Sequence, residues 1–443
     1  MRASSRPTTA AIVFKAALAG IAYLIAMMLS YRFGGGTAVE ANIWIASGVA
    51  IAVLTLADRA HWLAYAFAIV LGSVMGNLIA GSSIGASLVY AIDEVVVAAV
   101  TAWALQRLLG SDPRLDDVRR VMVFVAVGAL GGAVLGWLVA IPSYALLGLP
   151  SLASAWRLWI VSTGVGTLVI APLLFAWSDF RPKRSGGATM ADLALGGSLF
   201  VLLVAATLLV FAGATSERFS GSVGYALTYL PLPFLVLGGL VWGSRGATWS
   251  TFVMAAIAVL YTARGQGPFA GVEGFLGEAV VEVQGYVAAA ALLTLMLSAL
   301  DASRRLALRD AAAWRIRYEA VIGASDQLLY ELDPASGRIE WAGDTARLLG
   351  TQTSAIASLA GYLERVHPAD RDRLRNVLAD IGSDDITKAA TPHRFVSANG
   401  VELRLEGEAN AIVDFDDSVH RVVGFLRPVR AAQSVSASAL KAA

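Results

Sequence analysis

Two adjacent acids, Asp93 and Glu94, lie near the middle of an otherwise apolar stretch that runs from Ile84 to Leu109. If that stretch is a helix, about 15 Å separate Ile84 from Glu94 and about 20 Å separate Glu94 from Arg107. An ionisable group at such a depth in a bilayer costs about 2.5–3.5 kcal/mol on insertion scales, and it is therefore usually paired or functional. The position of the two carboxyls predicts a polar site inside a membrane bundle.

Neighbouring residues of a helix point about 100° apart, so Asp93 and Glu94 cannot share one face. At least one carboxyl should point into the bundle. Three interpretations are open: a polar clasp with Asn77, Ser162 or Thr163 on other helices, a pocket that binds a signal, or a path for protons or ions. The residues by themselves do not select one of the three.

A second group of charged residues lies near the C-terminal end of the apolar region. Glu278 and Glu282 are four residues apart and share one helix face. Helical rise places Glu282 about 28 Å from Asp301, near the outer boundary of the membrane. Arg264 lies on the same outer side. We expect either an ion pair that fixes a loop or a periplasm-facing ligand site made of Arg264, Glu278, Glu282 and Asn77.

No constellation of residues indicates catalysis. The chain has no cysteine, which excludes disulfides, cysteine-ligated metals and cysteinyl-flavin photochemistry. The four histidines, at positions 61, 367, 393 and 420, lack the spacing of metal ligands. Neither a GGDEF or EAL motif, a kinase histidine box nor a phosphate-binding loop is present. We therefore expect no catalytic residue, no metal site and no bound cofactor. The net charge of +1 also gives no reason to expect nucleic acid as a partner.

The composition of the chain indicates that membrane-spanning helices must position these charged residues. The chain is 57% hydrophobic and only 15% charged, with a mean hydropathy of +0.66, whereas soluble domains are about a quarter charged. Nearly all long apolar runs precede residue 300. Ten of them are candidate membrane spans, approximately at 11–31, 41–57, 61–80, 84–109, 120–141, 155–177, 191–213, 225–243, 246–263 and 275–300. The second and third, and the eighth and ninth, are joined so tightly that eight spans is an alternative.

The distribution of basic residues predicts an orientation. With the N-terminus in the cytoplasm, fourteen basic residues lie in cytoplasmic segments and four in outer loops, which satisfies the positive-inside rule. The four outer residues are Arg32, Arg157, Arg218 and Arg264. An even number of spans places both termini in the cytoplasm, and either count is even.

The membrane half resembles the membrane-associated sensor (MASE-type) domain. The similarity rests on "NIWIASGVAIAVLTL" (42–56), the Gly76–Asn77 pair, "WRLWIVSTGVGTLVIAPLLFAW" (156–177), "GGLVWGSRGA" (238–247) and "ARGQGPF" (263–269), in that order. Such bacterial domains precede cyclic-di-GMP enzymes and histidine kinases, so the resemblance implies a sensory function.

Two details follow from this resemblance. Family members tend to carry an acid near Glu94, which favours Glu94 as the inward carboxyl and leaves Asp93 to a structural partner. Members also usually have a proline directly after the tryptophan that corresponds to Trp44, whereas this chain has Ile45 there. Any kink in this helix is then expected at Ser47–Gly48.

A helical linker, 301–318, is expected to follow the membrane domain, 1–300. No glycine or proline occurs between Leu300 and Ile322, so the last span should continue into the linker without a break. A weak heptad pattern can be drawn through it. A parallel homodimer through this linker and the following domain is the partner arrangement that we expect.

Residues 319–430 change to short strands and helices. Expected elements are strands at 327–333 and 338–342, a helix capped by Asp344, two helices separated at Pro368, a hairpin around Asn399–Gly400 and a last strand that ends near Pro428. This α+β order resembles a PAS domain. The matching residues are Tyr330, Asp333, Gly337, Ile339, Trp341, His367, Pro368, Asp370 and Arg371.

The PAS resemblance also bears on single residues. His367 is interpreted as a residue that structures a loop rather than a haem ligand. Pro428 disfavours a strand ladder at its position. Residues 431–443 are small and polar and are expected to be disordered.

The sequence as a whole predicts a polytopic α-helical membrane bundle with about 8–10 transmembrane helices, followed by a small cytoplasmic α+β PAS-like domain. We expect a bacterial inner-membrane sensor that relays a membrane or periplasmic stimulus through a helical stalk to the PAS domain. Its output would come from a missing effector domain or from a partner such as a cytoplasmic signalling enzyme. The alternative is a transporter or channel with a regulatory PAS domain, against which no inverted repeat is visible.

Overall fold

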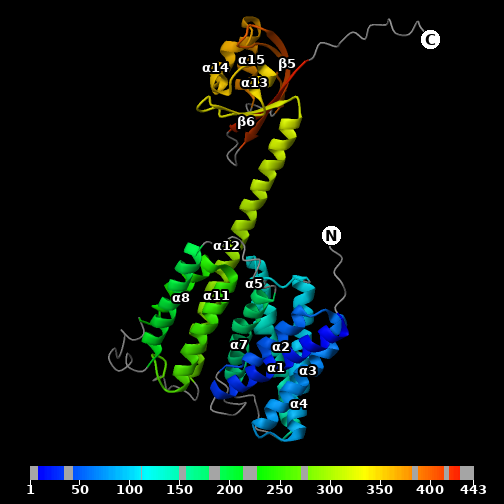
Figure 1. The fold of residues 1–443 in the computed structure, drawn as a ribbon, viewed down its shortest axis with the longest axis vertical. Coiled ribbons are helices and arrows are strands. Elements are labelled where there is room, and N and C mark those ends of the chain that lie inside the picture. The colour runs from blue at the N-terminus through cyan, green and yellow to red at the C-terminus, as the bar shows by residue number, and fades with distance from the viewer. Residues whose placement is uncertain are drawn as a thin grey trace, which may run out of the picture. The chain divides into compact units, whose positions relative to one another are not determined.

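The computed structural model describes residues 8–33, 43–110, 112–148, 156–178, 190–212, 227–270, 278–381, 388–413 and 419–429. Two compact units make up the chain, Met1–Leu306 and Ala307–Ala443. The first is helical, and the second combines a β-sheet with helices (Figure 1).

The first unit is a bundle of long helices (Figure 1). Its elements are α1 (Thr9–Phe33), α2 (Ile45–Leu56), η2 (Arg59–His61), α3 (Trp62–Ile79), α4 (Ile84–Leu109), α5 (Val118–Val123), η3 (Phe124–Gly131, a π-helix), α6 (Gly132–Leu146), α7 (Trp156–Trp177), α8 (Met190–Phe211), α11 (Pro231–Ala263) and α12 (Glu278–Ala324). The predicted apolar runs therefore correspond to helices.

Eight helices within the described residues are long and apolar enough to cross a membrane, judged by length and composition. Several carry a continuous stripe of exposed large apolar side chains at helical spacing, for example Leu88, Ile92, Val96, Val100 and Trp103 on α4. Exposing such apolar stripes to water on so many helices would be unfavourable, whereas contact with lipid is not. The unit is a multi-pass membrane bundle, as the apolar runs predict.

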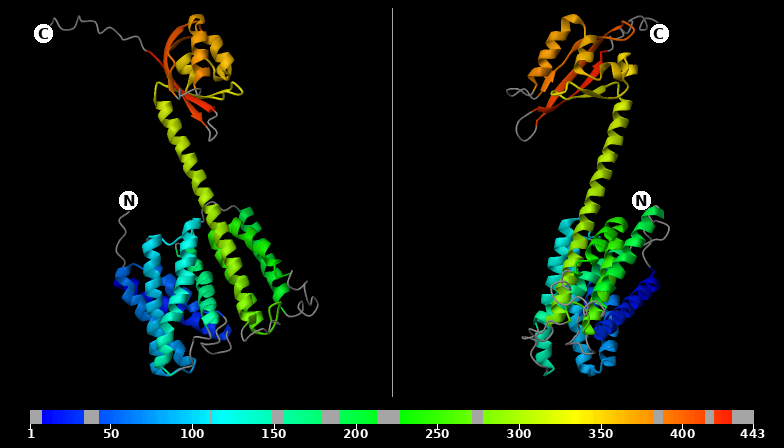
Figure 2. Two further views of the ribbon diagram at one scale, coloured as in Figure 1. Left: turned by 180° about the vertical axis from the view of Figure 1, so that it is seen from behind. Right: turned by 90° about the vertical axis from the view of Figure 1, so that its left-hand side faces the viewer.

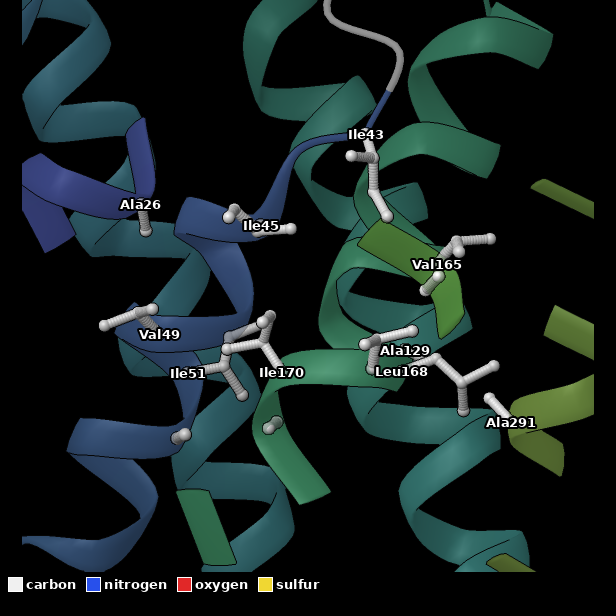
Figure 3. Close-up of a cluster of buried hydrophobic side chains, with 14 of the residues drawn as sticks. Ala26, Ile43, Ile45, Val49, Ile51, Ala129, Val165, Leu168, Ile170 and Ala291 are labelled. Atoms are coloured by element: carbon white, nitrogen blue, oxygen red, sulfur yellow. The ribbon is translucent and has the colours of Figure 1, made fainter. Parts of the chain in front are cut away.

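Helices α2 and α7 occupy the centre of this bundle. Ten of the twelve residues of α2 are buried. Figure 3 shows Ile45, Val49 and Ile51 of α2 in the same cluster as Ile170 of α7. A short helix can be accommodated here because its ends are satisfied by neighbours instead of water.

Both ends of α2 receive such partners. The Ser30 hydroxyl of α1 accepts a hydrogen bond from the Ile45 amide at 3.1 Å. At the other end, the Gln106 side-chain amide of α4 donates to the carbonyl oxygens of Leu54, Thr55 and Ala57. Helix α2 is thus fixed between α1 and α4 by polar contacts at its termini.

The crossing of α2 with α7 is very close. A Cβ atom on Gly48 would lie 2.9 Å from the Gly166 carbonyl oxygen, and one on Gly166 would lie 2.1 Å from the Trp44 carbonyl oxygen. Glycine at both positions lets the two backbones touch. The expected kink at Ser47–Gly48 is wrong, because α2 runs unbroken from Ile45. Instead the helix begins after Trp44, whose amide donates to the Ser162 carbonyl oxygen at 3.2 Å.

Helix α11 is bent back on itself at Gly243. This residue has φ +68° and ψ −163°, which is not helical. A Cβ atom on Gly239 would lie 3.2 Å from the Cβ of Ala247, although residues eight apart on a straight helix are separated by about 12 Å. The residues on either side of Gly243 therefore form an antiparallel pair.

Helix α12 extends without interruption from Glu278 to Ala324. The expected continuity between Leu300 and Ile322 is therefore confirmed. Its bounds include the last apolar run and the predicted linker.

The second unit is built on one antiparallel sheet. Its strands are β1 (Leu328–Leu332), β2 (Ile339–Ala342), β3 (Lys388–Ala390), β4 (His393–Val396), β5 (Glu402–Val413) and β6 (Val419–Pro428). Their order is β2-β1-β6-β5-β3, with β4 also paired to β5. Helices α13 (Thr345–Leu349), α14 (Leu359–Arg365) and α15 (Pro368–Asp380), with the short helix η5 (Thr353–Ile356), lie on one face of the sheet (Figure 2). This is the α+β arrangement that the PAS resemblance implies.

The local signals in this unit are confirmed in detail. Asp344 caps α13 by accepting from the Arg347 amide at 2.9 Å. Gly400 has φ +78° in the turn of the β4–β5 hairpin. His367 precedes α15, and its Nδ1 accepts from the Ala369 amide at 3.3 Å, so it does structure a loop. The tail 431–443 lies outside the described residues.

The ladder continues through Pro428, contrary to expectation. Pro428 is the last residue of β6 and lies opposite Leu405. The Val429 amide then donates to the Arg404 carbonyl oxygen at 2.8 Å. Since the next amide supplies the hydrogen bond, the missing N–H of proline is tolerated at the strand end.

His393 is buried inside the second unit between two polar partners. Its Nδ1 lies 2.8 Å from the Thr391 carbonyl oxygen, and its Nε2 lies 2.7 Å from the Tyr362 hydroxyl. A carbonyl oxygen can only accept, so Nδ1 carries the proton and Nε2 accepts from Tyr362. Burial lowers the pKa of His393 below its ordinary value of 6.5, although the Thr391 contact acts in the opposite direction.

This lowered pKa predicts a pH dependence of the stability of the second unit. The unfolded chain binds a proton near pH 6.5 more readily than the folded one, so stability is complete above that pH and falls as pH decreases below it. The loss cannot exceed about 1.4 kcal/mol per pH unit for one group. Hydrogen exchange of β5 and β6 amides in the full chain between pH 7.5 and 5.5, corrected for intrinsic rates, measures it. His393→Gln should flatten the dependence, and equal protection of the parent at both pH values would contradict the assignment.

Candidate functional site

A cavity of about 100 Å³ lies inside the helical unit. Six helices contribute to it, together with Trp44, which directly precedes α2. The lining residues include Tyr23 and Tyr31 of α1, Ser73 and Asn77 of α3, Tyr90, Asp93 and Glu94 of α4, Tyr144 of α6, and Trp159, Ser162 and Thr163 of α7, together with Trp44 and Ser47. This volume holds several water molecules or one small solute.

The cavity lies in one half of the bundle. Tyr31, Asn77 and Tyr144 are each two residues from the C-terminal ends of their helices, which are Phe33, Ile79 and Leu146. Tyr90 and Trp159 lie near the N-terminal ends of α4 and α7. All these ends belong to the side of the bundle opposite the start of α1. The lining therefore extends from that side down to Glu94, about 15 Å along α4 from Ile84.

Glu94 is held by the entrance of α2. Its carboxyl lies beside two polar groups, the Ser47 hydroxyl and the Trp44 side chain. Trp44 immediately precedes α2, and Ser47 lies in its first turn. The positive end of the α2 dipole and these two donors suit a carboxylate. Because α2 is itself fixed at both ends, Trp44 and Ser47 are held in place beside the Glu94 carboxyl.

Asp93 borders the same cavity but has a different partner. Its carboxyl lies beside Ser143 of α6. The two acids thus point to different neighbours, as the 100° rotation between adjacent residues predicts. Both remain accessible to whatever occupies the cavity, since both line it.

Asn77 belongs to the Glu94 cavity. Its Oδ1 accepts from the Tyr31 hydroxyl at 3.0 Å, and its Nδ2 donates to the Ser73 carbonyl oxygen at 2.9 Å. Ser162 and Thr163, the other two expected neighbours of the acids, line the cavity as well. The residues proposed for a polar clasp are brought together at one cavity, and Ser47 and Trp44 lie beside Glu94 there as well.

Six aromatic side chains surround these polar groups. Tyr31 meets Trp44 edge to face at a centroid distance of 5.5 Å, and Tyr144 meets Trp159 in the same way at 6.1 Å. Tyr90 lies 5.9 Å from Tyr144, and the sixth ring is Tyr23. Sequence reasoning missed this set except for Tyr90, which shares a helix face with Glu94. Of the other five, Tyr23 and Tyr31 lie on α1, whereas Trp44, Tyr144 and Trp159 come from three further segments, so no local sequence signal indicates that they meet.

The second group of charged residues is not assembled as a unit in the described part of the chain. Glu282 lines a different cavity of about 470 Å³ together with Tyr229, Phe269 and Tyr286. Arg264 is exposed at the end of α11 and lines neither cavity. No ion pair between Arg264 and Glu282 is present among the described residues. Glu278 begins α12, but its side chain lies outside the described part.

The motif "ARGQGPF" has a visible structural role instead. Gly265 and Gly267 have φ values of +70° and +85°, so the chain turns sharply after α11. The turn buries Phe269 against Phe211 and Tyr286, with centroid distances of 6.0 and 5.8 Å.

Comparison with protein families matches residues 12–305 to the MASE1 family model. No curated protein matched the chain. Several solved structures are similar to part of it, including the following three. A sensory box histidine kinase/response regulator from Burkholderia thailandensis has 16% identity and a TM-score of 0.22, covering 26% of this chain and 84% of that chain.

The second structure is the N-terminal domain of a diguanylate cyclase with a PAS/PAC sensor from Marinobacter aquaeolei, with 16% identity and a TM-score of 0.22, covering 23% of this chain and 94% of that chain. The third is an RNA-binding light-oxygen-voltage receptor with 22% identity and a TM-score of 0.21, covering 24% of this chain and 31% of that chain.

Proposed function

The chain belongs to the MASE1 family of membrane sensor domains over residues 12–305, and on that premise we propose that the stimulus is a ligand bound in the cavity around Glu94. The observation that carries the proposal is the enclosure of two membrane-depth carboxyls and six aromatic rings around one space. Structural acids would be covered by partners on every side, whereas these acids border an open volume.

The cavity faces the periplasm in this proposal. The excess of basic residues in the segments on the side of the α1 start supports a cytoplasmic location for that side and for both termini. The lining lies toward the opposite ends of the helices. A solute from outside a bacterial inner membrane would then reach Glu94 without crossing the whole bilayer.

Helix α7 offers a path from the cavity to α12. Trp159, Ser162 and Thr163 contribute to the cavity from the first half of α7. One to two turns further on, Leu168 of α7 and Ala291 of α12 border one small gap, and Figure 3 shows both residues in the same buried cluster. A shift of α7 on ligand binding would therefore act directly on α12. A ligand can drive such a shift only by binding one arrangement more tightly than the other.

The relay and the output are the remaining parts of the proposal. Helix α12 continues unbroken from Ala291 to Ala324, so it can transmit a rotation or a displacement to the PAS-like unit. The exposed side chains of Leu300, Trp314, Tyr318 and Val321 lie on the heptad series and support a parallel homodimer. The dimer, or a cytoplasmic signalling enzyme that it recruits, would provide the output.

A spin label on the linker tests this coupling. The chain has no cysteine, so Ala311→Cys creates one labelling site on an exposed position of α12. Because Glu94→Gln removes the acid at the centre of the cavity, we expect it to change the population ratio of two linker conformations by at least about five-fold. Electron paramagnetic resonance of the full chain in lipid nanodiscs measures the mobility of the label and the distance between labels.

Glu282→Gln is the matched control, because it neutralises an acid that does not line the cavity around Glu94. It should leave the spectrum unchanged. Identical spectra for the parent and Glu94→Gln would argue against the sensor proposal. If the parent protein shows ligand-dependent flux in proteoliposomes and Glu94→Gln abolishes that flux, the result would favour a transporter instead.

A further inference from the structure

We propose that the cavity around Glu94 recognises a small organic cation that carries an ammonium or trimethylammonium group. The inference rests on the proposed function and adds the chemical class of the ligand. Three properties of the lining support it: its charge, its aromatic walls and its size.

The charge of the lining is one-sided. Asp93 and Glu94 both border the cavity, and no lysine, arginine or histidine is among the described residues that line it. The hydrogen-bond donors around the acids, such as Ser47 and Ser143, are neutral. An anion would meet two carboxyls at close range in a medium of low dielectric constant, whereas a cation would supply the charge that the site lacks.

The aromatic walls favour an organic cation over a metal ion. Six of the lining residues are tyrosine or tryptophan, and their ring faces attract a cation within about 6 Å, tryptophan most strongly. The rings are braced by one another, since Tyr31 meets Trp44 and Tyr144 meets both Tyr90 and Trp159. Metal ions prefer several oxygen or nitrogen ligands. No group of three or more acidic, histidine or cysteine side chains that could hold a metal is present among the described residues.

Size and polarity narrow the class further. A cavity of about 100 Å³ suits a solute of a few non-hydrogen atoms rather than a drug-sized one. Asn77, Ser162 and Thr163 lie on the lining as well and can bind a hydroxyl or amide on the same molecule. A choline-like solute has this combination of a bulky cationic head and one polar group.

Choline chloride and its neutral carbon analogue, 3,3-dimethyl-1-butanol, provide a matched pair of probes. Isothermal titration calorimetry of the full chain in phosphatidylglycerol nanodiscs should show binding of choline and at least ten-fold weaker binding of the alcohol. Glu94→Gln should weaken choline binding at least ten-fold, and Trp159→Leu at least five-fold. Glu282→Gln, outside this cavity, should leave it unchanged. Size-exclusion profiles of each variant establish that it is folded.

Comparing nanodiscs of two lipid compositions tests whether the cationic group belongs to a free solute or to a lipid headgroup. If free choline binds equally in phosphatidylglycerol and phosphatidylcholine nanodiscs, the ligand is a free solute. If phosphatidylcholine abolishes the binding of free choline, a lipid headgroup competes for the same site. Both outcomes support recognition of the cationic group.

Three outcomes would overturn the inference: equal binding of choline and the neutral alcohol, failure of choline, ethanolamine and tetramethylammonium to bind the parent, or saturation by calcium chloride that excludes choline. The spin label at Ala311→Cys distinguishes failure of the proposed ligand class from failure of the sensor proposal. A response of the Ala311→Cys label to Glu94→Gln without choline binding would retain the sensor and reject the ligand class.

Discussion

Replacing Gly166 with alanine is expected to prevent the membrane unit from reaching its native packing. The added Cβ would lie 2.1 Å from the carbonyl oxygen of Trp44 and 2.5 Å from its carbonyl carbon. Both are backbone atoms, so no side-chain rotation relieves the contact. The backbones of α2 and α7 would have to separate by about 1 Å in a densely packed interior, which costs about 3 kcal/mol or more.

The same substitution two residues earlier provides the control. Gly164 lies on the same buried stretch of α7, but its Cβ would meet the Ala129 carbonyl oxygen at 3.5 Å, an ordinary contact. Gly164→Ala should therefore unfold within a few degrees of the parent, while Gly166→Ala aggregates or unfolds far below it. Thermal unfolding in detergent, followed by size-exclusion chromatography, compares them. Similar melting temperatures for the two variants would contradict the proposed closeness of α2 and α7.

The Gly166 contact also connects stability with the site. Trp44, whose carbonyl oxygen touches Gly166, is the residue whose side chain contacts the Glu94 carboxyl. Any separation of α2 from α7 would move Trp44 and Ser47 away from Glu94. A partly folded Gly166→Ala variant should consequently lose the linker response as well.

Gly243→Ala is the second substitution for which we expect a large effect, and here strain rather than crowding is the cause. With φ +68° and ψ −163°, Gly243 occupies a backbone region that is essentially restricted to glycine. No atom would lie within 4 Å of the added Cβ, so the whole penalty is conformational, about 1–3 kcal/mol. The turn would open, and the antiparallel pairing of the two halves of α11 would weaken.

Gly85→Ala is the control that separates backbone strain from the crowding of an added Cβ atom. Gly85 also has no atom within 4 Å of its added Cβ, but it lies inside the regular helix α4, where alanine is favoured by up to about 1 kcal/mol. Gly85→Ala should be neutral or stabilising in thermal unfolding, and Gly243→Ala should lower the midpoint. A Gly243→Ala variant as stable as Gly85→Ala would show that the reversal at Gly243 does not depend on glycine.

The separation at Gly243 also shows what apolar runs can and cannot predict. The two runs at 225–243 and 246–263 were correctly distinguished, because "WGSRG" interrupts them with a charge and two glycines. Their close antiparallel pairing was left open, since it depends on the contact of Gly239 with Ala247. Hydropathy measures how apolar a segment is, but it does not measure which segments touch.

The candidate site was predictable only in part for a similar reason. The depth of Glu94 follows from counting residues along one helix, and its accessibility to the cavity agrees with that count. Trp44, Tyr144 and Trp159 come from three other segments of the bundle, and nothing in their local sequence indicates that they line one cavity with Glu94. Their convergence is a property of tertiary packing.

The error at Ser47–Gly48 has the same origin. A serine–glycine pair often kinks a helix, but here both residues are needed inside a straight α2: Ser47 contacts Glu94, and Gly48 allows contact with α7. Small residues occur at these two positions because the backbones of α2 and α7 approach closely there. The non-helical residue is Trp44, directly before α2.

The buried position of α2 has a consequence for how the protein is made. A 12-residue helix with ten buried residues is too short to be recognised as a membrane span by its own hydrophobicity. Its main partner, α7, begins at Trp156 and emerges from the ribosome about 5–20 s after α2 at ordinary rates of synthesis. During that interval α2 must remain beside α1, α3 and α4 with the face that packs on α7 uncovered. Insertion of this sensor therefore cannot proceed one independent helix at a time, and the nascent bundle should depend on an insertase or chaperone until α7 arrives.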